Sequence, residues 1–410
     1  MTVMRRSRWL ARLAGGSGLA LGLAGLTALS ASTSAQARAG AVLIQSHVAA
    51  SWGDNSTGQL GDGLTTGSSR PLSADIGAGH DVVQVAAGYD HSLAVRSDGT
   101  VWAWGANRYG QLGDANTAIH VVPGQVTGLT GITQVAAGVM SSLALRSDGT
   151  VWAWGANGAG QLGRGTITDH EVTPARVAVL NHVTRISAGR GFALALRSDG
   201  IVFAWGLNGS GQLGNGTTAE SSKPVKIAGL SQVTGIAAGW DSAVAIESSS
   251  ISALTSVWTW GANDQGQLGD GTLAEHSTPE RVTGIPASVR GVSVGVRYAV
   301  VLGADGSVWG WGENVTGELG VAREGSAVTR PVNAIAAGSG ITQLSAGGGH
   351  VLALKSDGTV LAWGFNTFGQ LGNGTTAEVG GLGPVTGLTG ATYVAAGFLS
   401  SLAVHTVLGS

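Results

Sequence analysis

The sequence predicts an all-β protein, a seven-bladed β-propeller with four strands in each blade. Three short motifs, each present seven times, lead to this prediction because regular self-similarity at this period is the signature of repeat folds. The first is Trp-Gly, spaced by 50 to 55 residues, with tryptophans at Trp52, Trp104, Trp154, Trp205, Trp260, Trp311 and Trp363. The second is Gly-Gln-Leu-Gly, at 58–61, 110–113, 160–163, 211–214, 266–269 and 369–372, with Gly-Glu-Leu-Gly at 317–320. The third is Ala-Ala-Gly or a variant, ending at Gly88, Gly138, Gly189, Gly239, Gly295, Gly347 and Gly397.

Each repeat is composed of short strand-like runs. In one unit, residues 133–138, 142–146 and 150–155 alternate apolar with small or polar residues, the period of a β-strand. Ser147-Asp148-Gly149 between the second and third runs is typical of a hairpin turn. The same Asp-Gly pair recurs at 98–99, 199–200, 305–306 and 357–358. In the fifth repeat, residues 248–256 replace this turn and lengthen the spacing to 55 residues.

The two ends of the repeat region predict a closed ring. No Ala-Ala-Gly strand precedes Trp52, and no Trp-Gly follows the last copy at 394–404. Joined together, these two incomplete units make one complete blade, which leaves no sheet edge open. An open solenoid is the alternative, and it would expose two half-units.

Composition agrees with this fold and excludes some functions. Of the 410 residues, 70 are glycine, 43% are hydrophobic and 11% are charged, so the chain can bury a large core. The formal net charge is −2 and becomes −6 without Arg5, Arg6, Arg8 and Arg12, which argues against a nucleic-acid-binding surface. There is no cysteine, hence no disulfide and no lipid attachment at a cysteine.

The N-terminus has the features of an export signal. Arginines at 5–12 precede a short apolar stretch at 13–29, and small-residue cleavage patterns follow. We therefore expect residues 1–39 to be a signal peptide, cleaved after Ala37 or Ala39, and residues 40–410 to be the propeller. The mature protein is then secreted or held in the cell envelope, with no membrane span; an uncleaved N-terminal anchor is the alternative.

The repeats resemble those of the regulator of chromosome condensation repeat family. The resemblance rests on 85–95, Val-Ala-Ala-Gly-Tyr-Asp-His-Ser-Leu-Ala-Val, and on the Trp-Gly-x-Asn and Gly-Gln-Leu-Gly runs, and it covers residues 41 to 410. It implies a seven-bladed propeller and, from the family's eukaryotic founder, nucleotide exchange on a small GTPase and chromatin binding. Secreted bacterial propellers with similar but shorter repeats, which inhibit β-lactamases, offer a weaker analogy.

Most repeated residues are expected to be structural. The Trp-x-Trp-Gly pairs fit packing between blades better than sugar stacking. The seven asparagines that follow Trp-Gly, from Asn55 to Asn366, fit turn chemistry, in which asparagine bonds locally and tolerates a left-handed backbone. His91 and His350 share one repeat position and suggest a structural hydrogen bond. No spacing of histidines or carboxylates predicts a metal, a cofactor or a catalytic set.

The variable positions carry the functional prediction. Three residues that differ between repeats follow each Ala-Ala-Gly-type glycine, and five of these seven triplets contain an aromatic residue. Antiparallel strands place these loops on one face with the loops that follow Trp-Gly, and aromatic and arginine side chains are typical of protein-binding hot spots. The predicted partner-binding residues are Tyr89, Asp90, Met140, Arg190, Phe192, Trp240, Asp241, Arg297, Tyr298, Phe398, Arg108, Tyr109, Phe365 and Phe368.

These observations predict an exported, monomeric, non-enzymatic module that binds a partner protein, which could be an enzyme it inhibits. Guanine nucleotide exchange by family analogy is one alternative. A carbohydrate-binding or hydrolytic propeller acting at the central funnel is another, and paired carboxylates at that position would favour it.

Overall fold

The computed structural model describes residues 45–408 except 78, 250, 251, 253 and 323–326, so the expected signal peptide lies outside the described residues. The described part of the chain forms 28 strands and contains no helix, hence none that could cross a bilayer. The strands are β1 (Gln45–Gly53), β2 (Ser68–Ala74), β3 (Val82–Ala87), β4 (His91–Arg96), β5 (Val101–Gly105), β6 (His120–Gln125), β7 (Ile132–Ala137), β8 (Ser141–Arg146), β9 (Val151–Ala156), β10 (His170–Arg176), β11 (Val183–Ala188), β12 (Phe192–Arg197), β13 (Val202–Gly206), β14 (Ser221–Lys226), β15 (Val233–Ala238), β16 (Ser242–Ser248), β17 (Thr255–Gly261), β18 (His276–Arg281), β19 (Val289–Val294), β20 (Tyr298–Gly303), β21 (Val308–Glu313), β22 (Ala327–Ile335), β23 (Ile341–Ala346), β24 (His350–Lys355), β25 (Val360–Phe365), β26 (Val379–Pro384), β27 (Ala391–Ala396) and β28 (Ser400–Leu408).

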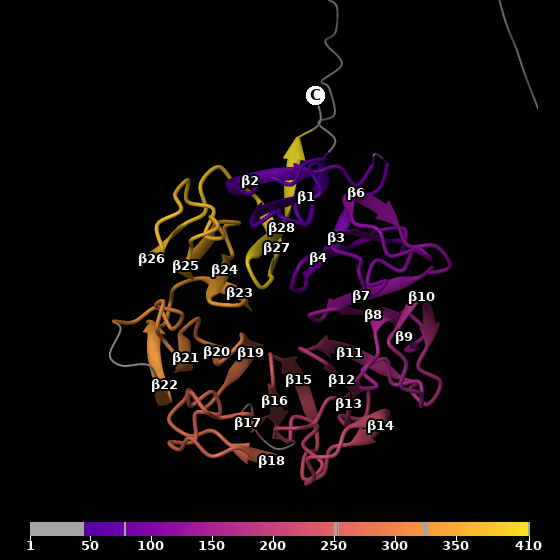
Figure 1. Ribbon diagram of the computed structural model, residues 1–410. Coiled ribbons are helices and arrows are strands. Elements are labelled where there is room, and N and C mark those ends of the chain that lie inside the picture. Colours follow the sequence, from indigo (N-terminus) through magenta and orange to yellow (C-terminus); the bar gives the residue numbers. More distant parts are fainter. Residues whose placement is uncertain (1–44, 78, 250–251, 253, 323–326, 409–410) are drawn as a thin grey trace, which may run out of the picture. The chain divides into compact units, whose positions relative to one another are not determined.

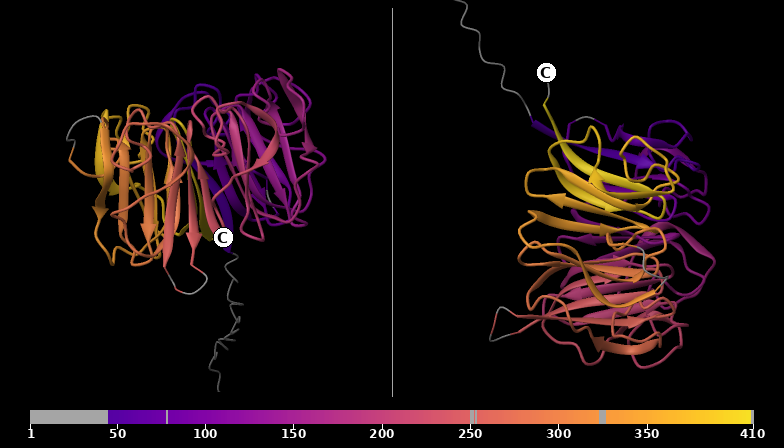
Figure 2. Two further views of the ribbon diagram at one scale, coloured as in Figure 1. Left: turned by 90° about the horizontal axis from the view of Figure 1, so that it is seen from below. Right: turned by 90° about the vertical axis from the view of Figure 1, so that its left-hand side faces the viewer.

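These strands make seven antiparallel four-stranded sheets arranged as a ring, which confirms the predicted propeller (Figure 1). Blades 1 to 6 follow chain order from β3–β6 to β23–β26, and their first strands line the centre. Seen edge-on, the strands run across the thickness of the ring (Figure 2). The loops from first to second strand and from third to fourth strand therefore share one face, which we call the loop face.

Blade 7 closes the ring by joining the two ends of the chain. Its strand order is β2-β1-β28-β27, and β1 pairs with β28 over nine residues, from Gln45 opposite Leu408 to Gly53 opposite Ser400. Figure 1 shows the first strand beside the last one. Because this blade takes strands from both termini, the ring closes without an incomplete blade, as the incomplete end repeats predicted.

The core consists of layers between neighbouring blades. One such layer combines Leu93 and Val95 of blade 1 with Val135 and Trp154 of blade 2. The second and third strands of each blade are covered on both faces, so their residues are almost all buried, whereas the fourth strands are partly exposed. Each blade is thus stabilised mainly by its neighbours.

The Trp-Gly and Gly-Gln-Leu-Gly motifs meet at each of these interfaces. The indole Nε1 of the buried Trp104 donates to the backbone oxygen of Gln59 in the preceding repeat, at 2.8 Å. Equivalent bonds of 2.8 to 2.9 Å join all seven pairs, including Trp52 to Gln370 across the closure. Gly61 has a φ of +72° and lies against the Trp104 indole, where a Cβ would be 2.8 Å from Nε1. The prediction that the tryptophans of the Trp-Gly motif pack between blades is confirmed.

The glycines of the third motif form a tight ring around the axis. A Cβ on Gly88 would lie 2.5 Å from the carbonyl oxygen of Gly138, the equivalent glycine of the next blade. The same close approach recurs from each of these seven glycines to the next, including Gly397 to Gly88. Glycine is required here because the first strands converge on the axis.

Candidate functional site

The three variable residues after each axial glycine occupy three different environments. The first residue lies at the mouth of the central channel, where the set is Tyr89, Val139, Arg190, Trp240, Val296, Gly348 and Phe398. The second residue is at least partly exposed in every repeat except the third, where Gly191 is buried. The third, such as His91, is in every repeat the buried first residue of the blade's second strand. Each variable triplet therefore contributes one residue to each of three layers: the channel mouth, the loop and the core between blades.

Three aromatic residues of the first layer meet at the channel mouth. The rings of Tyr89 and Phe398, from the adjacent blades 1 and 7, are stacked with centroids 4.1 Å apart and an interplanar angle of 20°. Trp240 reaches them from blade 4, with its ring 5.4 Å from that of Phe398 and 6.1 Å from that of Tyr89. All three side chains are half-buried, and we call this cluster the aromatic platform.

Arg190 and Asp241 flank the platform on the side of Trp240. The guanidinium of Arg190 lies over the Trp240 ring, 5.7 Å from its centroid, and its Nη2 is 2.8 Å from Asp241 Oδ2. Asp241 also accepts a 3.1 Å hydrogen bond from Gln212 Nε2. Burial raises the pKa of the Asp241 carboxyl, and the charge of Arg190 opposes this shift. The structure thus brings together Tyr89, Arg190, Trp240, Asp241 and Phe398 of the predicted set.

Phe192 and Tyr298, two of the predicted partner-binding residues, are corrected by the structure, because their side chains are inside the protein. Both are at most 1% exposed, and each packs in the layer between its own blade and the next. The Tyr298 hydroxyl donates to the backbone oxygen of His350 at 2.6 Å. Framework packing therefore explains these two aromatics, which were predicted to bind a partner.

The histidines of this third layer have the structural role that the sequence suggested. His91 Nε2 is 3.0 Å from Ser142 Oγ of the next blade, and His350 Nε2 is 2.8 Å from Ser401 Oγ. Both rings are buried, and this burial lowers the pKa of His91 to about 4 and that of His350 to about 3. They are neutral parts of the blade interfaces at physiological pH.

Apart from Asp90, the remaining predicted residues lie on the loop face away from the platform. Met140 is 39% exposed, and exposed Arg297 is 3.7 Å from Asp264 in a solvent-screened pair that contributes little stability. Arg108 lies over the ring of its neighbour Tyr109, 5.6 Å from the centroid.

A separate aromatic pair completes the predicted set. The rings of Phe365 and Phe368 are 6.3 Å apart, edge to face, and Phe368 is 40% exposed. These two residues, like Met140, make no ring contact with the platform among the described residues.

Buried amides hold the loops between the third and fourth strands in fixed conformations. The Oδ1 of Asn107 accepts from the backbone nitrogen of Leu112 at 3.0 Å, and the Oε1 of Gln111 accepts from that of Tyr109 at 2.9 Å. The same asparagine bond recurs in all seven repeats. Local turn bonding by asparagine is confirmed, but the left-handed backbone is not, because the described non-glycine residues with positive φ are Ala115, His182 and Gln232.

Two acidic residues, Asp90 and Asp54, add negative charge beside the platform, and only Asp90 belongs to the predicted set. Asp90 follows Tyr89, and burial raises its pKa to about 6, with the charge of Asp54 as the second cause. Asp54 Oδ2 accepts a 2.7 Å hydrogen bond from Gln59 Nε2. Asp54 was not predicted, although the residue directly after each Trp-Gly also varies between repeats and carried the same kind of signal.

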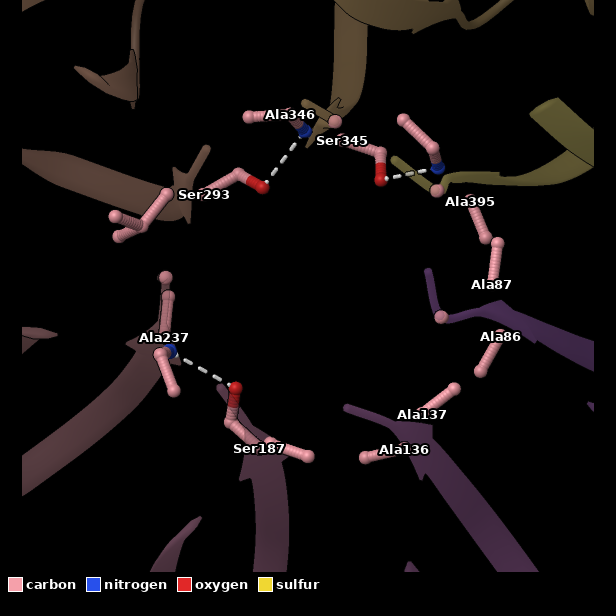
Figure 3. Close-up of a pocket in the computed structure, with 18 of the residues that line it drawn as sticks. Ala86, Ala87, Ala136, Ala137, Ser187, Ala237, Ser293, Ser345, Ala346 and Ala395 are labelled. Carbon is pink, nitrogen blue, oxygen red and sulfur yellow. Dashed lines mark hydrogen bonds between the residues drawn. The ribbon is translucent and has the colours of Figure 1, made fainter. Parts of the chain in front are cut away.

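The channel below the platform is narrow, with small side chains. Its cavity of about 300 Å³ is lined largely by alanine, serine and glycine, and its lining includes no aspartate or glutamate. Three serines accept hydrogen bonds from the next blade, such as Ser293 Oγ from the Ala346 backbone nitrogen at 2.9 Å (Figure 3). The paired carboxylates that would favour a hydrolytic funnel are not among these lining residues. Within the described ranges there is also no group of three or more potential metal ligands.

Comparison with known proteins agrees with this architecture. The RCC1-like domain family matches residues 30–245 and 122–408. The chain belongs to this family. It is 30% identical over 350 residues to the ultraviolet-B receptor UVR8 of Arabidopsis thaliana, which covers 84% of this chain and 79% of the receptor. It is 31% identical over 307 residues to the human E3 ubiquitin-protein ligase HERC2, covering 74% of this chain but 5% of the ligase.

Two solved structures show the same fold at lower sequence identity. Prp20p from Saccharomyces cerevisiae, described with its binding to Gsp1p and histones, has a TM-score of 0.78 and 24% identity over 90% of this chain and 93% of its own. Human WBSCR16 has a TM-score of 0.79 and 23% identity over 88% of this chain and 99% of its own.

Proposed function

We propose that this protein is an exported, monomeric, non-enzymatic module that binds a partner protein through the loop face, with the aromatic platform at the centre of the contact. The single observation that carries the proposal is the meeting of Tyr89, Trp240 and Phe398 at the channel mouth, half-exposed, although they come from three different blades. Clustered aromatics with an adjacent arginine are typical of the residues that dominate binding energy at protein interfaces.

The rigidity of the loops supports the same proposal. The buried amides of residues such as Asn107 and Gln111 fix the third-to-fourth-strand loops before any partner arrives. In the first-to-second-strand loop that carries Tyr89, the Gly88 nitrogen donates to the His91 oxygen at 2.8 Å. Binding would therefore lose little conformational entropy, which favours affinity. Prp20p, with its partners Gsp1p and histones, is a precedent within this fold for recognition of proteins.

Capture of a partner by the immobilised mature protein, residues 40–410, tests this proposal. Culture medium and cell-envelope extract are passed over the native form, over a variant with Tyr89→Ala, Trp240→Ala and Phe398→Ala, and over a control. The control changes Val179→Ala and Leu254→Ala, exposed apolar residues in loops of the opposite face. We expect one protein to be retained by the native and control forms and its yield to fall at least tenfold with the platform variant. Equal retention by a folded platform variant would contradict the proposal.

A further inference from the structure

Charge is distributed unequally between the two faces of the ring. Charged residues in loops are counted with the face on which the loop lies, and those in strands with the nearer face. In the described chain, the loop face then has fourteen acidic and seven basic residues, and the opposite face has nine of each. The acidic residues of the loop face are Asp54, Asp62, Asp90, Asp114, Asp169, Glu171, Glu220, Asp241, Asp264, Asp270, Glu275, Glu313, Glu318 and Glu378. Its basic residues are Arg70, Arg108, Arg164, Arg190, Lys223, Arg297 and Arg330. Such a face attracts cationic partners and repels phosphates.

The platform already holds one cation of the protein itself. Arg190 lies over the Trp240 ring and is paired with Asp241. This arrangement shows that an aromatic face here accepts a guanidinium when a carboxylate lies beside it, as expected for cation–π contacts. The other two rings, Tyr89 and Phe398, have no such cation over them among the described residues.

The carboxylate beside those two rings has no counter-charge. Asp90 is half-buried, and no described residue makes a hydrogen bond or ion pair with its side chain. The adjacent Asp54 adds a second negative charge, and both raise the pKa of the Tyr89 hydroxyl after the larger effect of its burial. A desolvated carboxylate without a partner is unfavourable. A cation arriving at this position would remove that cost.

We propose that Tyr89, Phe398 and Trp240, together with Asp54 and Asp90, form a recognition site for a lysine or arginine side chain presented by a basic segment of the partner protein. The site rests on the proposed function and specifies the chemistry of the partner. The cation would lie on the exposed side of the stacked Tyr89 and Phe398 rings, near Asp90 and away from Arg190. Cation–π attraction and charge pairing would act on the same group.

Fluorine NMR of the protein labelled with 5-fluorotryptophan tests the site directly. The Trp240 signal is assigned by its loss in Trp240→Phe, and the probe is acetyl-Gly-Arg-Gly-amide, with the neutral citrulline peptide as its matched control. We expect a saturable shift of the Trp240 signal with the arginine peptide and less than a fifth of that shift with citrulline. Asp90→Asn should weaken arginine binding about fivefold, which corresponds to about 1 kcal/mol. Asp148→Asn, on the opposite face, should leave it unchanged.

Equal shifts with arginine and citrulline, or the absence of a Trp240 shift at tens of millimolar peptide, would overturn the site. Capture of the partner by an Asp54→Asn, Asp90→Asn variant separates this failure from that of the proposed function. If the platform variant loses the partner and the double asparagine variant retains it fully, the protein-binding function stands and the cation site is refuted. If both variants lose it, and arginine but not citrulline shifts the Trp240 signal, both proposals are supported.

Discussion

The blade interfaces and the channel mouth both use large aromatic side chains, but in opposite ways. At the interfaces, one tryptophan per blade, such as Trp154, is fully buried and makes the same hydrogen bond in all seven repeats. At the mouth, three aromatics from blades 1, 4 and 7 form one half-exposed cluster without any repeat symmetry. The comparison indicates that an aromatic residue repeated in every blade serves packing between blades. An aromatic cluster that occurs once, on a framework of seven similar blades, indicates a specific surface.

The largest expected effect is on stability and separates the two regions directly. Trp154→Ala should lower the free energy of unfolding by about 4 kcal/mol, because it leaves a cavity between two blades and removes one of the two hydrogen bonds that the Gln111 oxygen accepts. Trp240→Ala should lower it by about 1 kcal/mol or less, because its ring is half-exposed. Urea unfolding followed by circular dichroism measures both. Comparable losses would show that the platform is also part of the framework.

A second pair of substitutions compares an axial glycine with a loop glycine two residues away. The Cβ of Gly189→Ala would overlap the Phe192 ring and the carbonyl oxygen of Gly239, so we expect the free energy of unfolding to fall by about 3 kcal/mol. Gly191→Ala meets Leu207 Cβ at 3.4 Å, an ordinary contact, and should change stability by less than about 1 kcal/mol. Thermal unfolding of the two variants provides the measurement. A tolerated Gly189→Ala would refute the close approach at the axis.

The buried histidines of the interfaces predict a pH dependence of stability. Burial lowers the pKa of His350 to about 3 from an ordinary value of 6.5, so below pH 6.5 the unfolded chain binds a proton that the folded protein excludes. Stability is therefore fully present above pH 6.5 and falls as the pH drops toward 3. When the pH is lowered from 7 to 5, the free energy of unfolding of His350→Gln should fall by about 2 kcal/mol less than that of the native protein. Between pH 7 and pH 8 the difference between the two proteins should stay constant, and a change there would point to another group.

The smallest expected effect belongs to the mouth. Burial raises the pKa of Asp90 to about 6, so its contribution to stability is favourable below its unfolded pKa of 3.8 and is lost as the pH rises through 6. Since this carboxyl is partly exposed, solvent screening reduces the effect, and Asp90→Asn should stabilise the protein by about 1 kcal/mol at pH 7. The gain should disappear near pH 4. A destabilised variant at pH 7 would show that the carboxylate has a folded-state partner.

The fate of the variable loop residues shows where sequence reasoning stopped short. Phe192 and Tyr298 were grouped with surface residues, yet each begins a strand and shares the alternation of its buried neighbours, as in Phe192, Leu194 and Leu196. Period-two alternation could have placed the third loop position in the core. The roles of His91 and of the repeated tryptophans were predicted correctly because these residues recur at fixed positions of the repeat, and each repeat packs against a neighbour of the same kind.

The sequence by itself determined the number of blades, the order of their strands and the closure of the ring. This was possible because each repeat encodes its own strands and turns, and because its apolar faces require a neighbour of the same kind. Only the tertiary structure decided which variable residues meet. Tyr89, Trp240 and Phe398 are separated by 151 and 158 residues in the chain, and they contact one another because ring closure brings blade 7 beside blade 1 and convergence on the axis brings blade 4 within reach of both.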